Sequence, residues 1–465
     1  MRIRVTLFVL LLTAVSSADT IRLKNGRSIV ADKVRTTGDK IEYQIGDNTF
    51  AIPRSLVDHI DAGGVPTASS GRESLPSIAP QGQIKNWEQL RAKVIHDGRV
   101  DPGALAELDK SSDPELAAAA YFVAGTFESD SGRAEQARLY LERALGYQPA
   151  NAIIVANYAN VLLALGRFSE AVPYAEKATR LAPDSAGAFA VLGLAYFQSD
   201  RTKDAITAWK HSLQLQPDDA VQALLSRAER EQAAESGFGE QESSHFTLRF
   251  EGGQTSPTLR RQLLETLEAE YGELSGTLGG APRDPISVTL YTNQAFFDVT
   301  AAPAWTGALN DGKLRIPIEG KEAVDSELAR VLKHELAHSF INQITHGRCP
   351  VWLNEGVAMM VEPRSSAGYG RDLARVFASG SYVPLNQLEG SFMNFTPQQA
   401  AVAYAESLAA VEYIRDTYGM SDVVRILQRI GEGASTESAL RSTIHSGYAQ
   451  LQDEISGYLQ RTYGN

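Results

Sequence analysis

The stretch KHELAHSFINQITHGRCPVWLNEGVAMMVE, residues 333–362, decides how the last part of this 465-residue chain is interpreted. His334 and His338 are four residues apart, and Glu335 lies between them. Helix start signals at residues 325–326 precede this stretch, and apolar residues then recur at helical spacing. We therefore expect a largely buried helix on which the two histidines project from one face.

A second helix is expected directly afterwards. The first helix runs to about Thr345, and HGRCP at residues 346–350 then turns the chain because it contains Gly and Pro. The next helix begins near Trp352 and runs back along the first one. At a rise of about 1.5 Å per residue, this return brings Glu355 level with His338.

These residues have the chemistry of a zinc site. The imidazoles of His334 and His338, one helical turn apart, can both reach one Zn²⁺ at about 2.0–2.1 Å. Glu335 is rotated away from that pair and can contact a water at the metal as a general base. Glu355 completes a set of three ligands and leaves a fourth position open, as catalytic zinc sites do. The alternative is packed core histidines with a chance glutamate, although such a motif arises by chance in only about one in a hundred sequences.

HELAH at residues 334–338, followed by WLNEG at 352–356, resembles the gluzincin metallopeptidases, and most closely the bacterial peptidase-MA-like group. The resemblance covers about residues 243–465 and implies an α+β, thermolysin-like domain. In that region predicted strands give way to helices, which also indicates an α+β domain. The zinc ligands that the resemblance implies are His334, His338 and Glu355, with Glu335 as the base.

The resemblance also implies supporting residues. Thermolysin-like relatives carry an acid four residues after the third ligand, where this chain has Met359. Asn354 and Glu362 are the candidates to orient a histidine instead. A Tyr or His commonly stabilises the oxyanion in the family, and Tyr404 is the candidate here; a packed aromatic residue is the alternative.

A possible substrate-binding strand lies just before the first helix. GKLRIPIEG, residues 312–320, alternates apolar side chains at Leu314, Ile316 and Ile318, so we expect a strand half exposed to solvent. Gluzincins generally hold an extended substrate along an edge strand near the metal, by backbone pairing. This strand is the candidate, and an ordinary sheet edge is the alternative.

Other candidate side chains are interpreted as structural. Cys349 is the only cysteine, so an internal disulfide is excluded, and we expect a buried thiol. His346 and His445 are expected in loops or at the surface.

Internal repetition organises the middle of the chain. Pro149, Pro183 and Pro217 recur every 34 residues. This period resembles the tetratricopeptide repeat, with three units and a capping helix over residues 118–235. Such repeats stack into a solenoid whose concave face usually binds a protein segment; a helical spacer without a partner is the alternative. The same period relates three sets of small residues: Gly125, Ala159 and Gly193; Ala137, Ala171 and Ala205; Ala144, Ala178 and Ser212.

The chain begins with MRIRVTLFVLLLTAVSSADT, a basic start followed by an apolar run from Val5 to Val15. This pattern predicts a secretory signal peptide, residues 1–18, cleaved after Ala18. The apolar run is shorter than the roughly 20 residues that span a bilayer; an uncleaved anchor is the alternative. We expect a secreted or periplasmic protein without a stable membrane span after cleavage.

Three further segments precede the repeats. Alternating apolar residues and Asn-Gly or Gly-Asp-Asn turns over residues 19–62 predict two hairpins in a small β module. Residues 63–84, rich in Gly, Ser and Pro, are interpreted as a linker. Residues 85–117 lack the 34-residue signature and are expected to form a helical lead-in.

The composition and the motifs together predict a multidomain, exported zinc metallopeptidase that hydrolyses peptide bonds and binds a protein partner through its repeats. A net charge of −12 argues against a nucleic-acid partner. The alternatives are a non-catalytic zinc-binding interaction scaffold and a zinc hydrolase for another bond. Scaffolds of this origin usually lose a ligand or the base, and this chain retains all four. We also expect a fragment starting near residue 240 to fold without the repeats.

Overall fold

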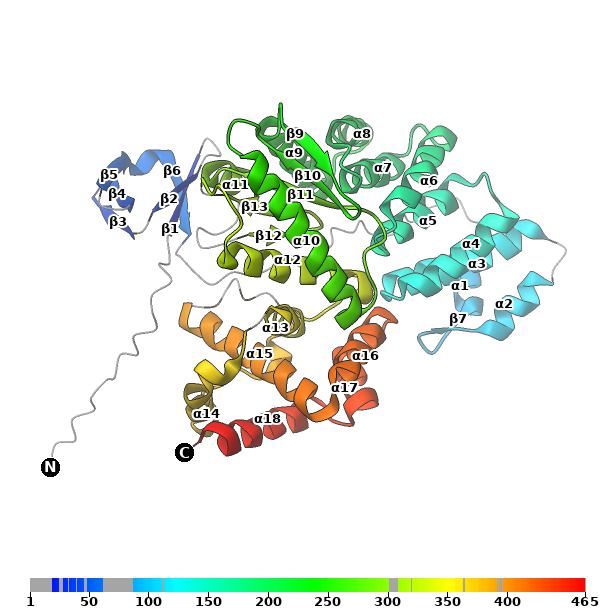
Figure 1. Cartoon of the computed structure of the whole chain (residues 1–465). Helices are drawn as coiled ribbons and strands as arrows, with labels where there is room; N and C mark the ends of the chain where they lie inside the picture. Colours follow the sequence, from blue (N-terminus) through cyan, green and yellow to red (C-terminus); the bar gives the residue numbers. More distant parts are fainter. Residues whose placement is uncertain are drawn as a thin grey trace.

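The amino-terminal β region of this computed structural model consists of two three-stranded antiparallel sheets, ordered β2-β1-β6 and β3-β4-β5 (Figure 1). The pairs β1–β2 and β4–β5 are the two expected hairpins. Ile21, Ile41 and Val57 are buried between the sheets. The strands are β1 Asp19–Leu23, β2 Ser28–Ala31, β3 Lys33–Thr37, β4 Lys40–Ile45, β5 Asn48–Pro53 and β6 Val57–Asp61.

Two of the segments expected from the sequence, the signal peptide at residues 1–18 and the linker at 63–84, lie outside the described residues. The structure describes residues 19–24, 28–31, 33–38, 40–45, 48–61, 87–110, 113–300, 308–318, 320–362, 364–390, 392, 395 and 397–464.

The repeat region is a helical solenoid, as the 34-residue period predicts. Helices α3/α4, α5/α6 and α7/α8 form three antiparallel pairs, α9 follows them, and α1 and α2 form the lead-in (Figure 1). Each second helix ends two residues before Pro149, Pro183 or Pro217. The helices are α1 Trp87–Val94, α2 Pro102–Asp109, α3 Pro114–Asp130, α4 Ala134–Tyr147, α5 Ala152–Ala164, α6 Phe168–Leu181, α7 Ala186–Gln198, α8 Thr202–Leu215 and α9 Asp219–Ala234; a short hairpin, β7 Ile95–His96 and β8 Arg99–Val100, joins α1 to α2.

Small residues let the paired helices approach closely. A Cβ atom at Gly193 would lie 2.4 Å from the ring of Trp209, and one at Gly125 would lie 2.6 Å from Leu141 Cγ. These separations are too short for any side chain, so the period of small residues has a packing cause.

The turn inside each repeat contacts the carboxy-terminal region. Residues 132, 166 and 200, which are related by the 34-residue period, all have positive φ angles of 59–73°. One contact per repeat connects the solenoid to the carboxy-terminal region at or next to these turns. The contacts are Arg348 Nη1 to Gly132 O at 3.1 Å, Phe168 N to Asp284 Oδ2 at 2.7 Å, and Lys313 Nζ with Asp200 Oδ1 at 2.8 Å.

A five-stranded sheet, ordered β12-β13-β11-β10-β9, begins the carboxy-terminal region. β10, β11 and β13 are parallel, whereas β9 and β12 are antiparallel to their neighbours. Leu314 and Ile316 of β13 pack in the core that includes α10 and α12. Arg315 points to the opposite face because side chains alternate along a strand, and it contacts α9 there. The elements are β9 Gly239–Glu242, β10 Phe246–Phe250, α10 Pro257–Leu278, β11 Ile286–Tyr291, α11 Asn293–Thr300, β12 Leu309–Asn310 and β13 Leu314–Pro317.

The expectation for residues 312–320 was wrong in two respects. β13 lies between β11 and β12, so it is not at the edge of the sheet. Arg315 is fully buried rather than exposed, because the solenoid helix α9 covers that face. The edge strand on this side is β12, of two residues.

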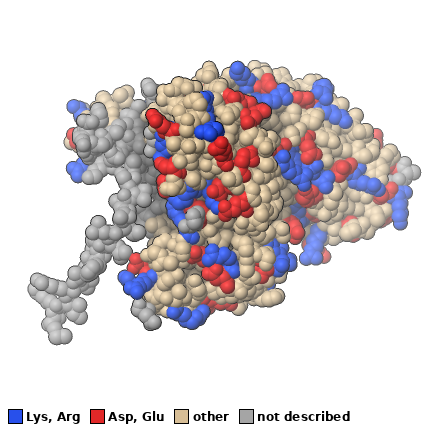
Figure 2. Space-filling view, viewed as in Figure 1, with Lys and Arg blue, Asp and Glu red and all other residues tan. Residues whose placement is uncertain are grey.

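In Figure 1, α12 lies below the sheet, and the helices that follow it in the chain form the lower half of the molecule. In the described part of the chain, none of the helices combines the length and apolar character needed to cross a membrane. Acidic and basic side chains are mixed over the face shown in Figure 2. The helices are α12 Ser326–Thr345, α13 Val351–Val361, α14 Gly370–Ala378, α15 Pro397–Tyr418, α16 Met420–Gly431, α17 Thr436–Ile444 and α18 Tyr448–Tyr463, with 3₁₀ turns at Arg54–Leu56, Ser366–Gly368 and Leu385–Gln387.

Candidate metal centre

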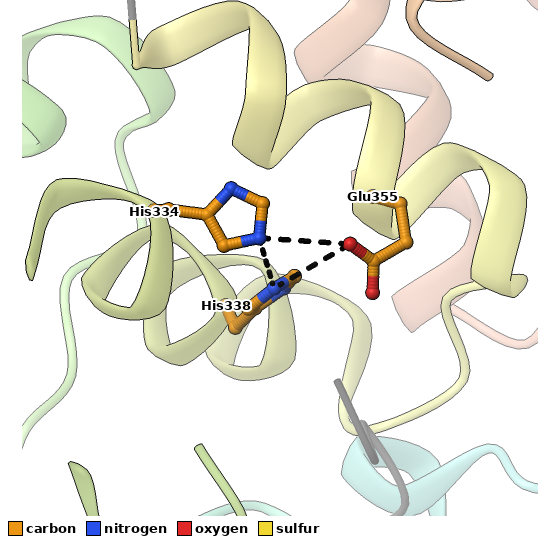
Figure 3. Close-up of side chains that lie close together, drawn as sticks. All are labelled: His334, His338 and Glu355. Carbon is orange, nitrogen blue, oxygen red and sulfur yellow. Dashed lines mark hydrogen bonds and ion pairs between the residues drawn. The ribbon is translucent and has the colours of Figure 1, made fainter. Parts of the chain in front are cut away.

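Helix α12 holds both histidines on one face. Asp325 caps its start, and its carboxylate accepts a hydrogen bond from Leu328 N at 2.7 Å. His346 ends it in the left-handed conformation, at φ 52°. The bounds agree with those expected from the sequence, and His334 and His338 lie side by side (Figure 3).

Helix α13 follows the turn at residues 346–350 and packs directly on α15. A Cβ atom at Gly356 would lie 2.4 Å from the carbonyl oxygen of Ser407, so only glycine permits this approach. Glu355, the preceding residue, then faces the two histidines from α13 (Figure 3).

Three donor atoms converge between the two helices. His334 Nε2 lies 3.2 Å from His338 Nε2 and 3.6 Å from Glu355 Oε2, and His338 Nε2 lies 3.9 Å from the same oxygen. Ligands of a tetrahedral zinc ion with bonds of about 2.0–2.1 Å would be separated by roughly 3.3 Å. Among the described residues this is the group of His and Glu side chains that fits a metal ion, so the residues present fit Zn²⁺.

A second layer of polar groups orients each histidine. Asn354 Oδ1 lies 3.0 Å from His338 Nδ1, and Glu362 Oε1 lies 3.5 Å from His334 Nδ1, an ion-pair distance rather than a short hydrogen bond. Each of the two residues that the sequence offered for orienting a histidine therefore contacts one ring: Asn354 contacts His338, and Glu362 contacts His334. Arg330 Nη1 also donates to Glu362 Oε2 at 2.6 Å.

These neighbours separate the pKa values of the two histidines. Burial opposes the charge of His334, but Glu355 and Glu362 outweigh it and raise its pKa to about 10. Burial lowers the pKa of His338. Burial also opposes the charge of Glu362, but His334, Arg364 and Arg330 hold the pKa of this carboxyl below its usual range.

Glu335, next to His334 in α12, has one buried carboxylate oxygen without a hydrogen bond. Its side chain is buried, and its Oε2 atom has no hydrogen bond. Burial raises its pKa to about 7, with His334 opposing the rise and Glu355 adding to it. A group with these properties accepts protons readily near neutral pH.

Tyr404 on α15 has a buried hydroxyl without a hydrogen-bond partner. Burial raises its pKa well above the usual value, and Glu355 and Glu335 add to this rise. Its ring packs against Phe392, with centroids 5.4 Å apart. Tyr404 is therefore both a packed aromatic residue and an unpaired donor.

The remaining sequence candidates have structural positions. His346 and His445 end α12 and α17 in the left-handed conformation. Cys349 is buried, and burial raises its pKa well above its usual value, so its thiol stays protonated. Sequence reasoning missed Asn310, whose side chain contacts α12; it precedes Asp311 in an Asn-Asp-Gly turn signal that marks the position but not the contact.

The helices of the solenoid differ in how much apolar surface they expose. Every residue of α5 from Ile154 to Leu163 is buried, so this helix presents no open face. Among the described residues of the repeats, exposed large apolar side chains lie on the second helices at Leu139, Leu181 and Leu215, and near the start of α3 at Leu116.

Comparisons with known proteins agree with both regions. Residues 270–460 match the model of the Peptidase MA superfamily, and residues 122–186 and 159–220 match that of the tetratricopeptide repeat. The chain thus contains a Peptidase MA superfamily region and tetratricopeptide repeats.

Individual relatives match the repeats. The chain is 31% identical over 111 residues to the Hsp70-Hsp90 organizing protein of Triticum aestivum; the match covers 24% of this chain and 19% of that protein's length. The first tetratricopeptide domain of Spaghetti bound to an HSP90 peptide is 20% identical, with a TM-score of 0.24, over 25% of this chain and 93% of that one. The Sgt2 domain from Aspergillus fumigatus is 24% identical, with a TM-score of 0.25, over 32% and 93%. The family matches carry more weight than these structures.

Proposed function

We propose that this protein is an exported zinc metallopeptidase of the gluzincin type that hydrolyses peptide bonds. The single observation that supports this best is the convergence of His334, His338 and Glu355, with unpaired buried atoms of Glu335 and Tyr404 beside them. Buried polar atoms are nearly always hydrogen-bonded, so unpaired ones around a donor cluster indicate a ligand. The Peptidase MA match favours hydrolysis of a peptide bond. A thermolysin-like fold of residues 243–465 is part of the proposal.

Zn²⁺, when bound, would acidify a water molecule and polarise the substrate carbonyl. His334, His338 and Glu355 would hold it. Glu335 would accept the proton of the attacking water and return it to the leaving amine, a task for which a pKa near 7 is suited. Tyr404 would donate its hydroxyl hydrogen to the oxygen that gains charge.

The repeats and the amino terminus complete the proposal. Tetratricopeptide arrays bind protein segments. The exposed leucines on the second helices α4, α6 and α8 offer such a partner apolar contacts. The basic start and apolar run at residues 1–18 support export to the periplasm or the medium.

The test is a comparison of the full chain with Glu335→Gln. Elemental analysis should find about one Zn per chain in both proteins, because Glu335 is not a ligand. Hydrolysis of an unstructured peptide pool should fall by about 10² or more, since Gln cannot accept the proton. Melting temperatures should agree closely.

Two outcomes would contradict the proposal. A Gln variant that cleaves as well as the wild type would exclude Glu335 as the base. A wild type that holds zinc but cleaves no peptide in the pool would favour the scaffold alternative.

A further inference from the structure

Asn310 connects the edge of the sheet to the helix that carries the proposed base. It is the last residue of β12, and only 4% of it is exposed. Its side-chain nitrogen donates to the carbonyl oxygen of Glu335 at 2.6 Å and to Ser339 Oγ at 2.7 Å. Its side-chain oxygen accepts from Gly312 N at 3.1 Å, so the amide is fixed on both sides.

The position of the Glu335 carboxylate depends on this backbone. Its Oε2 atom is buried and without a hydrogen bond, so no partner holds that end of the side chain. The carboxylate is then placed by the course of α12 and by side-chain packing. Asn310 donates hydrogen bonds to α12 at the carbonyl oxygen of Glu335 and at Ser339 Oγ, one turn further along the helix.

The segment between β12 and β13, together with Arg315 of β13, is connected to the solenoid by ion pairs. Asp311 pairs with Arg227 of α9. Lys313 Nζ and Arg315 Nη2 each lie 2.7 Å from a different oxygen of Glu231, also on α9. Asp311, Lys313 and Arg315 are nearly inaccessible to solvent, as is Glu231, so these pairs are well shielded from salt.

We propose that Asn310 is a positioning residue for Glu335, and that the solenoid helix α9 sets its position through Asp311, Lys313 and Arg315. This inference deepens the proposed function and rests on it for the role of Glu335. The contact chain runs from α9 to the β12–β13 turn, then to Asn310, and then to the backbone of α12. The repeats thus contribute to the order of the catalytic centre.

A first experiment reads the link without activity. Amide hydrogen exchange of α12 is measured in the full chain for wild type, Asn310→Ala and Arg227→Met. Exchange around residues 335–339 should be about fivefold faster or more in Asn310→Ala, because this change removes both hydrogen bonds that Asn310 donates to α12. Arg227→Met should change the same amides, although residue 227 lies in the solenoid. Unchanged exchange of α12 in Arg227→Met would overturn the link.

A second experiment reads catalysis. Asn310→Ala should lower kcat by about tenfold at unchanged zinc content, with KM within about twofold, because the base is misplaced while the ligands remain. The double variant that combines Asn310→Ala with Arg227→Met should be no slower than Asn310→Ala alone, since both changes act on one chain of contacts. Multiplicative losses would contradict this. Asn157→Ala removes another buried amide, in α5, and should leave kcat and α12 exchange unchanged.

These measurements separate the two proposals. A wild type without peptide hydrolysis, combined with coupled exchange, would refute the proposed function and support the link. An active wild type with independent exchange would do the reverse.

Discussion

Two buried polar clusters in this protein differ in how completely their charges are paired. In the cluster between α9 and β13, each charged side chain has an oppositely charged neighbour; Arg315, for example, contacts both Glu231 and Asp311. In the cluster between α12 and α13, Glu335 Oε2 and the neighbouring Tyr404 Oη have no hydrogen bond.

This difference distinguishes a structural cluster from a site. Unpaired buried polar atoms cost free energy, so two of them next to a group of metal-ligating side chains indicate a site for a ligand. A paired cluster satisfies its members internally, so its removal should mainly lower stability and should reach the chemistry only through the contact of Asn310 with α12. The predictions below test that division.

The largest effect is expected from Arg315→Met. This change leaves Glu231 and Asp311 buried with fewer partners, and breaking a buried pair typically costs about 3–5 kcal/mol. Urea unfolding of the full chain measures it. Arg441→Met removes an exposed pair with Glu437 and should cost no more than about 1 kcal/mol. Equal small losses would show that the α9 cluster is not structural.

Tyr404→Phe should affect chemistry and spare folding. It removes one hydroxyl that has no partner in the fold, so stability and zinc content should stay near wild type. Loss of an oxyanion donor lowers kcat by about 10²-fold. Tyr413→Phe on the same helix serves as the control, because its hydroxyl lies 3.4 Å from Glu454 Oε2, away from the site. Comparable kcat in both variants would leave Tyr404 a packing residue.

Asn354→Ala should weaken zinc binding by about 10–100-fold, because Asn354 orients the ring of His338. Competition with a chelator of known affinity measures this. Asn160→Ala, a buried amide in the solenoid, is the control and should leave affinity unchanged. Full affinity in Asn354→Ala would exclude this orienting role.

The smallest predicted effect is a pH dependence. With a pKa of about 10, the His334 ring is positively charged at neutral pH in protein stripped of metal. The ring must lose its extra proton before it can bind zinc. Its contribution to the stability of that protein is fully present below the unfolded pKa of about 6.5 and is lost as pH rises through 10. Calorimetry in two buffers at pH 7 should detect about one proton released by this group per zinc; no release would contradict the assignment.

Local sequence patterns predicted what local contacts determine. The 34-residue period predicted the helix pairs because each repeat packs on its neighbours, and the turn after Thr345 predicted that Glu355 would face His338. The role of these residues and the domain boundaries stay predictions.

Local patterns could not predict what distant segments determine. An arginine such as Arg315 in β13 is typical of an exposed strand position. Its burial here depends on Glu231, which lies 84 residues earlier in the chain. No short-range periodicity reports such a pairing. The same contact gives a reason to expect that a fragment starting near residue 240 folds poorly, since it would expose Arg315 and Lys313 without α9.

The anchored turns of the solenoid also fix its length. In a free array, a 34-residue unit can be deleted because each repeat contacts only its neighbours. Here the turns at Gly132, Phe168 and Asp200 each meet their own contact on the carboxy-terminal region. Deleting one unit would place a turn opposite a contact that belongs to a different turn. The spacing of the three contacts on the carboxy-terminal region therefore fits a solenoid of three repeats.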